Sequence, residues 1–299
     1  MENFRLKVFR SVAKNLSFTK AANELFITQP AITKHIRNLE NELDLRLFNR
    51  KGNKIYLTAE GIVLLEFADE LFNLQLKLED KLNSFKETLS GSFRLGASTT
   101  IAQYVIPPVL SLFHKRYIDV KLSLLTKNTE QIADALLRGE IDLGIVEGKI
   151  KNTDIHYSKF ISDELVAVTS AQNPLANKGE ISFRQLLSMP LILRERGSGT
   201  LDVIEHAFKS RRIKFSSLNI QMYLGSTEAI KLYLEHDDCI GFVSFRALKN
   251  EIKMGKLRII RIKNFQIKRT LEFITPQGLK PTNVASQFIK LAKEYYNQK

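Results

Sequence analysis

Apolar residues near the start of the chain recur at the spacing of an α-helix. Phe4, Val8 and Val12 are four residues apart, and Leu6 and Phe9 lie beside them. This period predicts a helix with one face directed at a core. We therefore expect the stripe to be buried.

Two further short helices are predicted directly after the first. Ser17 is suited to cap a helix over residues 18–25, whose adjacent alanines leave room for another helix to approach closely. Thr28 can cap a third helix, and Pro30 then falls in its first turn, where the missing N–H group costs nothing. Two short helices joined by a tight turn form a helix-turn-helix unit.

The third helix has two different faces. Ile32, Ile36, Leu39 and Leu43 follow the i, i+4, i+7 rule and predict a buried face. Polar residues and one proline gather on another face: Gln29, Pro30, Thr33, Lys34 and Arg37. An amide can bond bidentately to adenine, a hydroxyl and its methyl group suit base edges, and cations contact phosphate. The face is typical of a recognition helix; the alternative is a polar face that is simply solvated.

A basic hairpin is predicted downstream of this helix. Arg50, Lys51 and Lys54 lie in the run RKGNKIYLT, where Gly52-Asn53 is a favoured turn between two extended pieces. Such a wing would place its cations against a phosphate backbone.

Residues 60–88 are predicted to form one long helix. Its apolar residues alternate steps of three and four, the seam of a coiled coil, at Leu64, Phe67, Leu71, Leu74 and Leu78. Leu82 and Phe85 continue the seam, and Ser90-Gly91-Ser92 is expected to end the helix as a hinge. The stripe could pack on its own chain, but the charged flanking faces favour self-association into a dimer.

The remainder of the chain alternates between two patterns. Apolar, often β-branched runs predict strands at residues 93–98, 120–126, 141–148, 164–170, 191–195, 219–224 and 239–245. Helical periodicity covers residues 131–139, 201–212, 227–238 and 284–296. This alternation predicts an α/β architecture with largely parallel sheets.

Two strand-to-helix loops are candidates for binding a small anion. Ligands of open α/β sheets bind beyond the carboxyl ends of the strands, where helix N-termini offer free N–H groups. One loop carries hydroxyls and the other an arginine with a glycine-rich turn, so that the candidate residues are Ser98, Thr99, Thr100, Arg194, Ser198 and Thr200. Weaker candidates are Glu147, Ser226 and Thr227. The alternatives are that the hydroxyls only cap helices and that Arg194 pairs with Glu195.

Composition narrows the classes of function. The 299 residues carry 45 Lys and Arg against 32 Asp and Glu, a net charge of +13, which makes a polyanionic partner plausible. The single cysteine, Cys239, excludes an intramolecular disulfide and is expected to be a buried hydrophobe. No apolar stretch is long enough to span a membrane, so a cytoplasmic protein is expected.

Enzyme signatures are missing from the sequence. The five histidines are scattered, and neither an H-E-x-x-H nor a C-x-x-C motif occurs. Gly197-Ser-Gly199 lacks the third glycine of a dinucleotide fingerprint. We therefore expect no catalytic residues, no metal and no cofactor.

The N-terminal segment resembles a known family. The run SFTKAANELFITQPAITKHIRNLENELDLRLFNR, followed by LTAEG, is similar to the N-terminal domain of LysR-type transcriptional regulators. The resemblance implies a winged helix-turn-helix whose third helix enters the major groove. It assigns Thr28, Gln29, Pro30, Thr33, Lys34 and His35 to the recognition helix and Arg50 to the start of the wing.

The resemblance also implies an organisation for the whole chain. A DNA-binding domain (1–60) is followed by a dimerising linker helix (61–90) and an effector-binding domain (91–299). The effector-binding domain is expected to fold like a periplasmic binding protein, with subdomain I at residues 92–162 and 267–299, subdomain II at 163–266, and a small-molecule site between them. The family forms dimers, commonly paired into tetramers, so the operator should contain half-sites related by approximate two-fold symmetry.

The sequence thus predicts a DNA-binding transcriptional regulator that responds to a small anionic effector. Two other classes remain open at this point. One is a nonspecific architectural DNA-binding protein, and the other is a small-molecule binding protein with a vestigial DNA-binding head.

Overall fold

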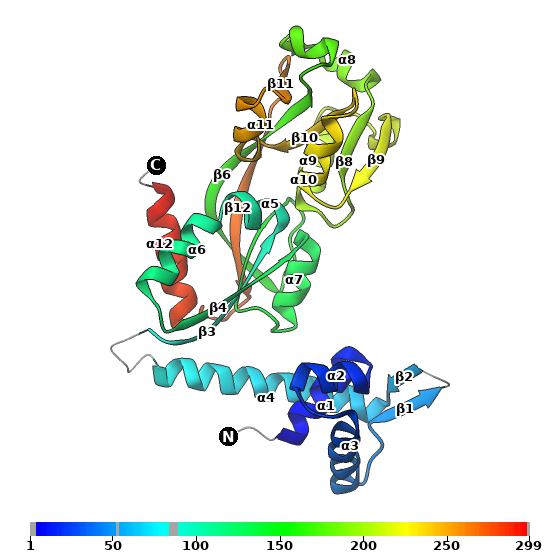
Figure 1. Ribbon diagram of the computed structural model, residues 1–299, viewed down its shortest axis with the longest axis vertical. Coiled ribbons are helices and arrows are strands. Elements are labelled where there is room, and N and C mark those ends of the chain that lie inside the picture. The colour runs from blue at the N-terminus through cyan, green and yellow to red at the C-terminus, as the bar shows by residue number, and fades with distance from the viewer. Residues whose placement is uncertain (1–3, 52–53, 84–88, 298–299) are drawn as a thin grey trace. The chain divides into compact units, whose positions relative to one another are not determined.

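The computed structural model describes residues 4–51, 54–83 and 89–297 (Figure 1). The chain forms two compact units, Met1–Glu79 and Asp80–Lys299. We describe each of them by itself.

The first unit contains the three predicted short helices and the hairpin. Its elements are α1 (Phe4–Asn15), α2 (Phe18–Leu25), α3 (Gln29–Leu43), β1 (Phe48–Lys51) and β2 (Lys54–Leu57). Both predicted caps are confirmed: the Ser17 side chain accepts a hydrogen bond from the Lys20 N–H, and Thr28 accepts one from Ala31. Strands β1 and β2 pair antiparallel, and the turn residues 52–53 lie outside the described part of the chain.

The core of this unit is built from the apolar faces of the three helices. Val8, Phe9, Val12, Ile32 and Ile36 are all buried in it. Two expectations were wrong. Leu43 is 41% exposed, because α3 ends there and Asp44 turns the chain into the left-handed conformation. Phe4, at the free end of α1, is 39% exposed.

A buried carboxylate connects α3 to the wing. Oε1 of Glu40 accepts hydrogen bonds from the backbone N–H groups of Leu47 (2.8 Å) and Phe48 (3.4 Å). The Thr58 hydroxyl donates to the carbonyl of Arg46 at 2.7 Å and accepts from the N–H of Gly61 at 2.9 Å. These local bonds fix where β1 begins and where the next helix starts.

That next helix, α4, spans Ala59–Asn83. Leu64 is half-buried against the core of the first unit, and Ala68 is fully buried. The rest of the predicted seam is exposed by more than half of each side chain: Phe67, Leu71, Leu74 and Leu78. The Leu82 side chain and Phe85 lie outside the described residues.

Charged contacts attach α4 to α1. Asp69 pairs with Arg10 and, at 3.2 Å, with Lys14. The Arg10 guanidinium also lies 5.0 Å from the centroid of the Phe72 ring. The first half of α4 is therefore part of the first unit's packed structure.

The second unit begins earlier than the predicted hinge allows. Gly91 and Ser92 already belong to strand β3 (Gly91–Ser98), where they pair with Val120 and Lys121. The expected hinge at residues 90–92 was wrong for these two positions, because the ladder to β4 orders them.

One continuous sheet runs through the second unit. Its principal order is β4-β3-β5-β12-β6-β10-β8-β9, with β11 and β7 paired off this path. The strands are β4 (Val120–Lys127), β5 (Leu143–Glu147), β6 (Ile155–Ser170), β7 (Glu180–Ile181), β8 (Leu191–Arg194), β9 (Ile220–Leu224), β10 (Ile240–Ser244), β11 (Leu257–Ile262) and β12 (Ile267–Pro276). Every strand predicted from the sequence has a counterpart here.

Along its principal order the sheet is parallel only at its two ends. Strands β4, β3 and β5 are parallel to one another, and so are β10, β8 and β9. The long strands β6 and β12 join these two groups by antiparallel pairing. The prediction of largely parallel sheets therefore holds for each group but not for the connection between them.

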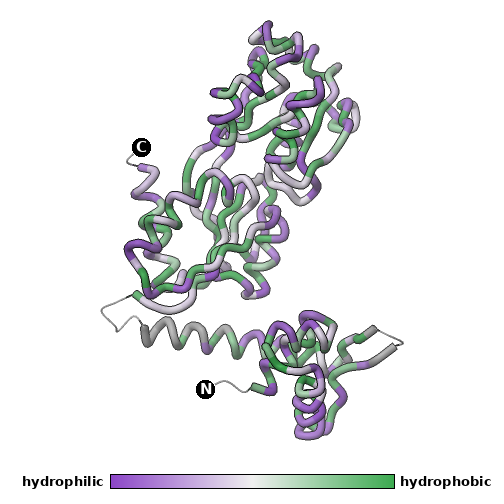
Figure 2. The backbone as a smooth tube through the Cα atoms, in the orientation of Figure 1, coloured by the Kyte–Doolittle hydropathy of each residue, from purple (hydrophilic) through white to green (hydrophobic). Residues whose placement is uncertain are grey.

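Helices cover the two parallel groups. They are α5 (Thr99–Tyr104), α6 (Pro107–Arg116), α7 (Thr129–Leu137), α8 (Phe183–Ser188), α9 (Gly199–Ser210), α10 (Thr227–Leu234), α11 (Lys249–Lys253) and α12 (Asn283–Asn297), with short 3-10 turns η1 (Pro174–Asn177), η2 (Phe215–Ser217) and η3 (Phe245–Ala247). Figure 2 shows hydrophobic stretches following the strands that these helices cover.

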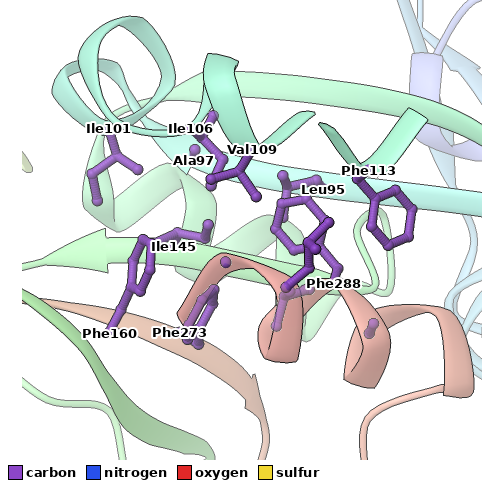
Figure 3. Packing of buried hydrophobic residues seen from close by; sticks show 14 of the residues in the cluster. Leu95, Ala97, Ile101, Ile106, Val109, Phe113, Ile145, Phe160, Phe273 and Phe288 are labelled. Atoms are coloured by element: carbon purple, nitrogen blue, oxygen red, sulfur yellow. The ribbon is translucent and has the colours of Figure 1, made fainter. Parts of the chain in front are cut away.

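Each parallel group has its own core. Around β3 and β5, Phe113 from α6 and Phe288 from α12 pack with their ring centroids 5.2 Å apart (Figure 3). Around β8 and β10, Phe208 from α9 packs edge-on against Phe242. Each parallel group also has a second cluster of buried residues, around Ile132 in the first group and Ile230 in the second. The two groups, joined by two long strands, form two subdomains with a border between them.

Candidate functional site

The outer face of α3 is polar and open to solvent. Gln29, Pro30, Lys34 and Arg37 are exposed there, and Thr33 is half-buried. Together with Asn38 and Asn41 these residues line a shallow groove of about 560 Å³. The two asparagines were missed by the sequence reasoning, although Asn38 stands four residues after Lys34 and Asn41 four after Arg37.

Two residues on this face, Gln29 and Thr33, are joined by two hydrogen bonds. The Gln29 amide donates to the Thr33 hydroxyl at 3.2 Å, and that hydroxyl donates to the Gln29 carbonyl at 3.1 Å. The Thr28 hydroxyl accepts from the Ala31 N–H at 3.4 Å, so it serves as the cap of α3.

His35 does not share the exposed face. Its ring lies edge-on against Phe4, with centroids 5.1 Å apart, and its Nδ1 is buried without a hydrogen-bond partner. The family resemblance assigns His35 to the recognition helix together with Lys34, but consecutive helical residues point about 100° apart, so the His35 side chain lies toward α1.

The basic residues of the wing are only partly described. Arg50 and Lys51 belong to β1 and Lys54 to β2, with Arg50 opposite Ile55 and Lys51 opposite Lys54. Their side chains lie outside the described part of the structure.

In the second unit, the predicted hydroxyl loops meet across the subdomain border. Thr100, in the first turn of α5, lies with its Oγ1 3.0 Å from Oγ1 of Thr227, the first residue of α10. Both side chains are buried. Ser226 instead caps α10 by accepting from the Ala229 N–H at 3.1 Å, and Thr99 is half-buried.

Glu147 lies at the centre of this border, although the sequence marked it as a weak candidate. Its side chain is 1% exposed. Ser98, at the end of β3, donates to Oε2, and Thr200, at the start of α9, donates to Oε1 at 3.2 Å. Hydroxyls from both subdomains therefore converge on one carboxylate.

Arg269 completes the network and was missed by the sequence reasoning. Its Nη1 donates to the Thr200 hydroxyl at 2.8 Å and lies 3.4 Å from Oε1 of Glu147. Its Nε donates to Asp163 at 2.8 Å, and Ser244 donates to the same carboxylate. A signal existed: in IKRTLEF the arginine alternates with three apolar residues, Ile267, Leu271 and Phe273, on one strand face.

Arg194 is buried at the end of β8. Its Nε and Nη2 bond Glu195 at 2.8 and 2.9 Å, the pairing that the sequence left as an alternative. Its Nη1 is buried without a hydrogen-bond partner. One edge of this guanidinium is therefore occupied by Glu195, and the other has a nitrogen able to donate to an anion.

The glycine turn after Arg194 allows the subdomains to touch. Gly197 has a φ of +81°, and Ser198 is buried and forms no side-chain cap bond. A Cβ placed on Gly199 would lie 1.9 Å from the carbonyl oxygen of Glu147. Only glycine permits this approach of two backbones.

Cys239 is fully buried, as predicted. Its thiol donates to Asp237 at 3.0 Å, and burial raises its pKa from 9.0 to about 12. The bond from Cys239 in turn lowers the pKa of the Asp237 carboxyl. A thiol held in its protonated form is a poor nucleophile.

Within the described residues, no group of three or more His, Cys, Asp or Glu side chains is arranged to hold a metal ion. None of the helices that the described residues form combines the length and the apolar character needed to cross a membrane.

Two family models match the chain. The model described as a bacterial regulatory helix-turn-helix protein of the lysR family matches residues 4–62, and the LysR substrate binding domain matches residues 86–297. The fold and these matches define a DNA-binding transcription regulator with an effector-binding domain. The chain belongs to the LysR family of transcriptional regulators, whose members are not enzymes.

Similar proteins agree with this assignment. The chain is 34% identical over 278 residues to a probable RuBisCO transcriptional regulator of Thalassiosira pseudonana, covering 91% of this chain and 90% of that protein. The crystal structure of full-length CbnR complexed with its target DNA has the same fold, with a TM-score of 0.68 at 21% identity over 98% of this chain and 99% of that one.

A third comparison concerns the effector-binding domain. The regulatory domain of CcmR from Synechocystis PCC6803, in complex with 2-PG, matches with a TM-score of 0.63 and 29% identity. The match covers 69% of this chain and 97% of that domain.

Proposed function

We propose that the protein binds specific operator DNA through the exposed face of α3. The main support for this proposal is that the exposed face carries an amide, a hydroxyl and two cations, whereas the opposite face packs into the core. In this proposal Gln29 and Thr33 read base edges, with Pro30 beside them, while Lys34 and Arg37 contact phosphates.

Other predicted residues have different parts in the proposal. Thr28 contributes through the cap that starts α3, and His35 through its packing on Phe4. The wing cations Arg50, Lys51 and Lys54 contact the backbone beside the groove.

We infer that the protein acts as a dimer. Four large apolar side chains on one seam of α4 are each more than half exposed, and a coiled-coil partner would bury them. Two copies would present two recognition helices to half-sites related by two-fold symmetry. Pairing of dimers into tetramers follows the habit of the family.

We propose that the effector is a small anion bound between the subdomains. The buried Nη1 of Arg194 lacks a hydrogen-bond partner, and helix α9 begins five residues further along the chain, at Gly199. The other residues that the proposal assigns to this site are Ser98, Thr99, Thr100, Glu147, Ser198, Thr200, Ser226 and Thr227. The CcmR domain with 2-PG is a similar fold solved with a bound compound.

Binding of an effector would have to change the contacts between the two subdomains. The Thr100–Thr227 bond and the hydroxyl bonds to Glu147 already satisfy most polar groups there. An effector shifts the equilibrium between arrangements only by its difference in affinity for them. Binding therefore exchanges internal bonds for ligand bonds and moves one subdomain against the other.

Gel retardation with promoter fragments from its own genome tests the DNA proposal. We expect binding to an operator roughly a thousandfold tighter than to a random duplex of equal length. Equal affinities would identify a nonspecific architectural protein. Retardation of no duplex at low ionic strength would identify a binding protein with a vestigial head.

The effector proposal has a separate test. Arg194→Ala should abolish the response of the protein–operator complex to an anionic effector while leaving operator retention unchanged. A matched control is Arg258→Ala, an exposed arginine on β11. An unchanged response in Arg194→Ala would place the effector elsewhere.

A further inference from the structure

The groove on the outer face of α3 extends beyond the residues that the sequence predicted to contact DNA. Five of its seven lining residues belong to that predicted set, and the other two are Asn38 and Asn41. We call this surface the α3 groove. Arg37 is the last of the predicted residues in it, so the two asparagines continue the groove toward the C-terminal end of the helix.

Helical geometry places Asn41 on the middle of this face. An α-helix turns by about 100° per residue, so Asn41, eleven residues after Pro30, points within about 20° of the same direction. Asn38 stands four residues after Lys34 and points about 40° from it. At about 1.5 Å per residue, the face from Gln29 to Asn41 is about 18 Å long. The major groove of B-DNA is only about 12 Å wide, so this face is long enough to reach a phosphate backbone beyond the base edges.

The described residues that line the α3 groove include no carboxylate. The two glutamates in the second half of α3 have partners elsewhere. Glu40 is buried and accepts from the backbone N–H groups at the start of β1, and Glu42 pairs with Arg5. The groove therefore combines the cations Lys34 and Arg37 with neutral polar groups, and its charge is complementary to a polyanion along its whole length.

Asn38 and Asn41 are free to bond a partner molecule. Both are exposed, and neither side chain forms a hydrogen bond to another of the described residues. Gln29 and Thr33 in the same groove, in contrast, already bond each other. An asparagine amide has two N–H donors, and amide side chains donate to phosphate oxygens in protein–DNA complexes.

We propose that Asn38 and Asn41 position the recognition helix by donating hydrogen bonds to phosphates of double-stranded DNA. Base contacts of a helix-turn-helix come from the N-terminal residues of its recognition helix, so phosphates are the acceptors that remain for the C-terminal half. DNA is the occupant because the groove is continuous with the face that the proposed function assigns to DNA, and the inference rests on that proposed function. The two asparagines add neutral contacts to a site whose other proposed phosphate contacts are cations.

Fluorescence anisotropy of a labelled random-sequence duplex, titrated with the full chain at several salt concentrations, tests the proposal. Random DNA is a sufficient probe, because phosphate contacts do not depend on sequence. Asn38→Lys/Asn41→Lys places two cations beside the proposed phosphates. We expect roughly tenfold tighter binding at low salt, and a slope of log affinity against log salt that is steeper by about two.

The matched control for the lysine pair is Glu42→Lys. This single substitution changes the net charge by the same amount on the same helix, but at an exposed position outside the α3 groove. It should leave the salt slope unchanged. A gain in affinity and slope that only the lysine pair shows cannot be produced by a variant that merely fails to fold.

Asn38→Ala/Asn41→Ala removes the donors without changing a charge. We expect binding to the random duplex and to the operator to weaken by the same factor, about tenfold, because two hydrogen bonds are lost. The salt slope should stay at the wild-type value, since a neutral donor releases no counterion. Both side chains are exposed, so the unfolding temperature should not fall.

Four results would overturn this inference while the wild type binds DNA. The lysine pair leaves affinity and slope unchanged; Glu42→Lys steepens the slope as much as the lysine pair does; the alanine pair binds both duplexes like the wild type; or the alanine pair loses more affinity for the operator than for random DNA, which would indicate base readout. A wild-type chain that binds no duplex at low ionic strength overturns the proposed DNA function, and this inference with it.

Discussion

The exposed face of α3 and the border between the two subdomains contain similar side chains but differ in how far these are buried. Both contain hydroxyls and cations. On α3 the cations Lys34 and Arg37 are exposed, whereas at the border Arg269, Glu147 and Asp163 are buried and bonded to one another. A surface for a large polyanion can be built open and stay solvated. At the proposed effector site between the subdomains the polar groups are bonded to one another, so that a ligand would have to replace bonds that already exist.

The largest difference in the free energy of unfolding should appear when one cation is removed from each of these two regions. Arg269→Ala leaves the carboxylates of Glu147 and Asp163 buried without their shared partner, and we expect it to lower the free energy of unfolding by about 3–5 kcal/mol. Lys34→Ala removes an exposed charge and should change it by no more than about 0.5 kcal/mol. Urea unfolding of the full chain measures both. Similar values for the two variants would remove the contrast between the regions.

A buried carboxylate in the DNA-binding unit sharpens the comparison. Glu40→Ala leaves the buried N–H of Leu47 without its acceptor and should cost about 1–3 kcal/mol of unfolding free energy. Its matched control is Glu42→Ala on the same helix, because Glu42 is exposed and pairs with the exposed Arg5. Surface pairs contribute about 0–1 kcal/mol. Equal losses of unfolding free energy in the two variants would show that burial of the carboxylate does not determine its contribution to stability.

On the exposed face of α3, one substitution should change sequence discrimination and another should change overall affinity and its salt dependence. Gln29→Ala should cost about 1–3 kcal/mol of discrimination at one base pair, because the proposed function assigns its amide to a base edge. Lys34→Gln should weaken all duplexes alike and reduce the slope of log affinity against log salt by about one. Binding to a set of singly substituted operators at several salt concentrations measures both. A uniform loss across all sequences for Gln29→Ala would exclude it from base readout.

The smallest effect on stability at neutral pH concerns Cys239, which is buried in the second unit just before β10. Its folded pKa of about 12 exceeds the unfolded value of 9.0, so both states are protonated below pH 9 and the thiol adds no pH dependence there. Between pH 9 and 12 the unfolded thiol ionises first, and stability should fall. At pH 8, alkylation of the native protein should be roughly a hundredfold or more slower than in urea. Equal rates would show an accessible thiol.

Features with local causes were predictable from the sequence. Ser17 and Thr28 act as caps because the donors they bond lie three residues ahead in the same chain. The α/β alternation also required only local periodicity. The helix-turn-helix and the family could therefore be identified from the residues alone.

Features that depend on distant partners were not predictable. Arg269 bonds Asp163 and Thr200, residues 106 and 69 positions away, and its strand pattern shows only an unusual charge. Glu147 was undervalued because nothing near it in sequence reveals the hydroxyls of Ser98 and Thr200. The packing of His35 on Phe4 could not be predicted, because it depends on how α1 crosses α3.

Gly199 sets the distance between the two halves of the effector-binding domain. Any larger residue would bring a carbon to within 1.9 Å of the Glu147 carbonyl, where ordinary contact begins at 3.4 Å. The halves would have to separate by roughly 1.5 Å to admit a single methyl group. The absence of a side chain at this position thus allows the two subdomains to pack in direct backbone contact. Gly199→Ala is therefore the simplest substitution that would hold them apart without changing a charged residue.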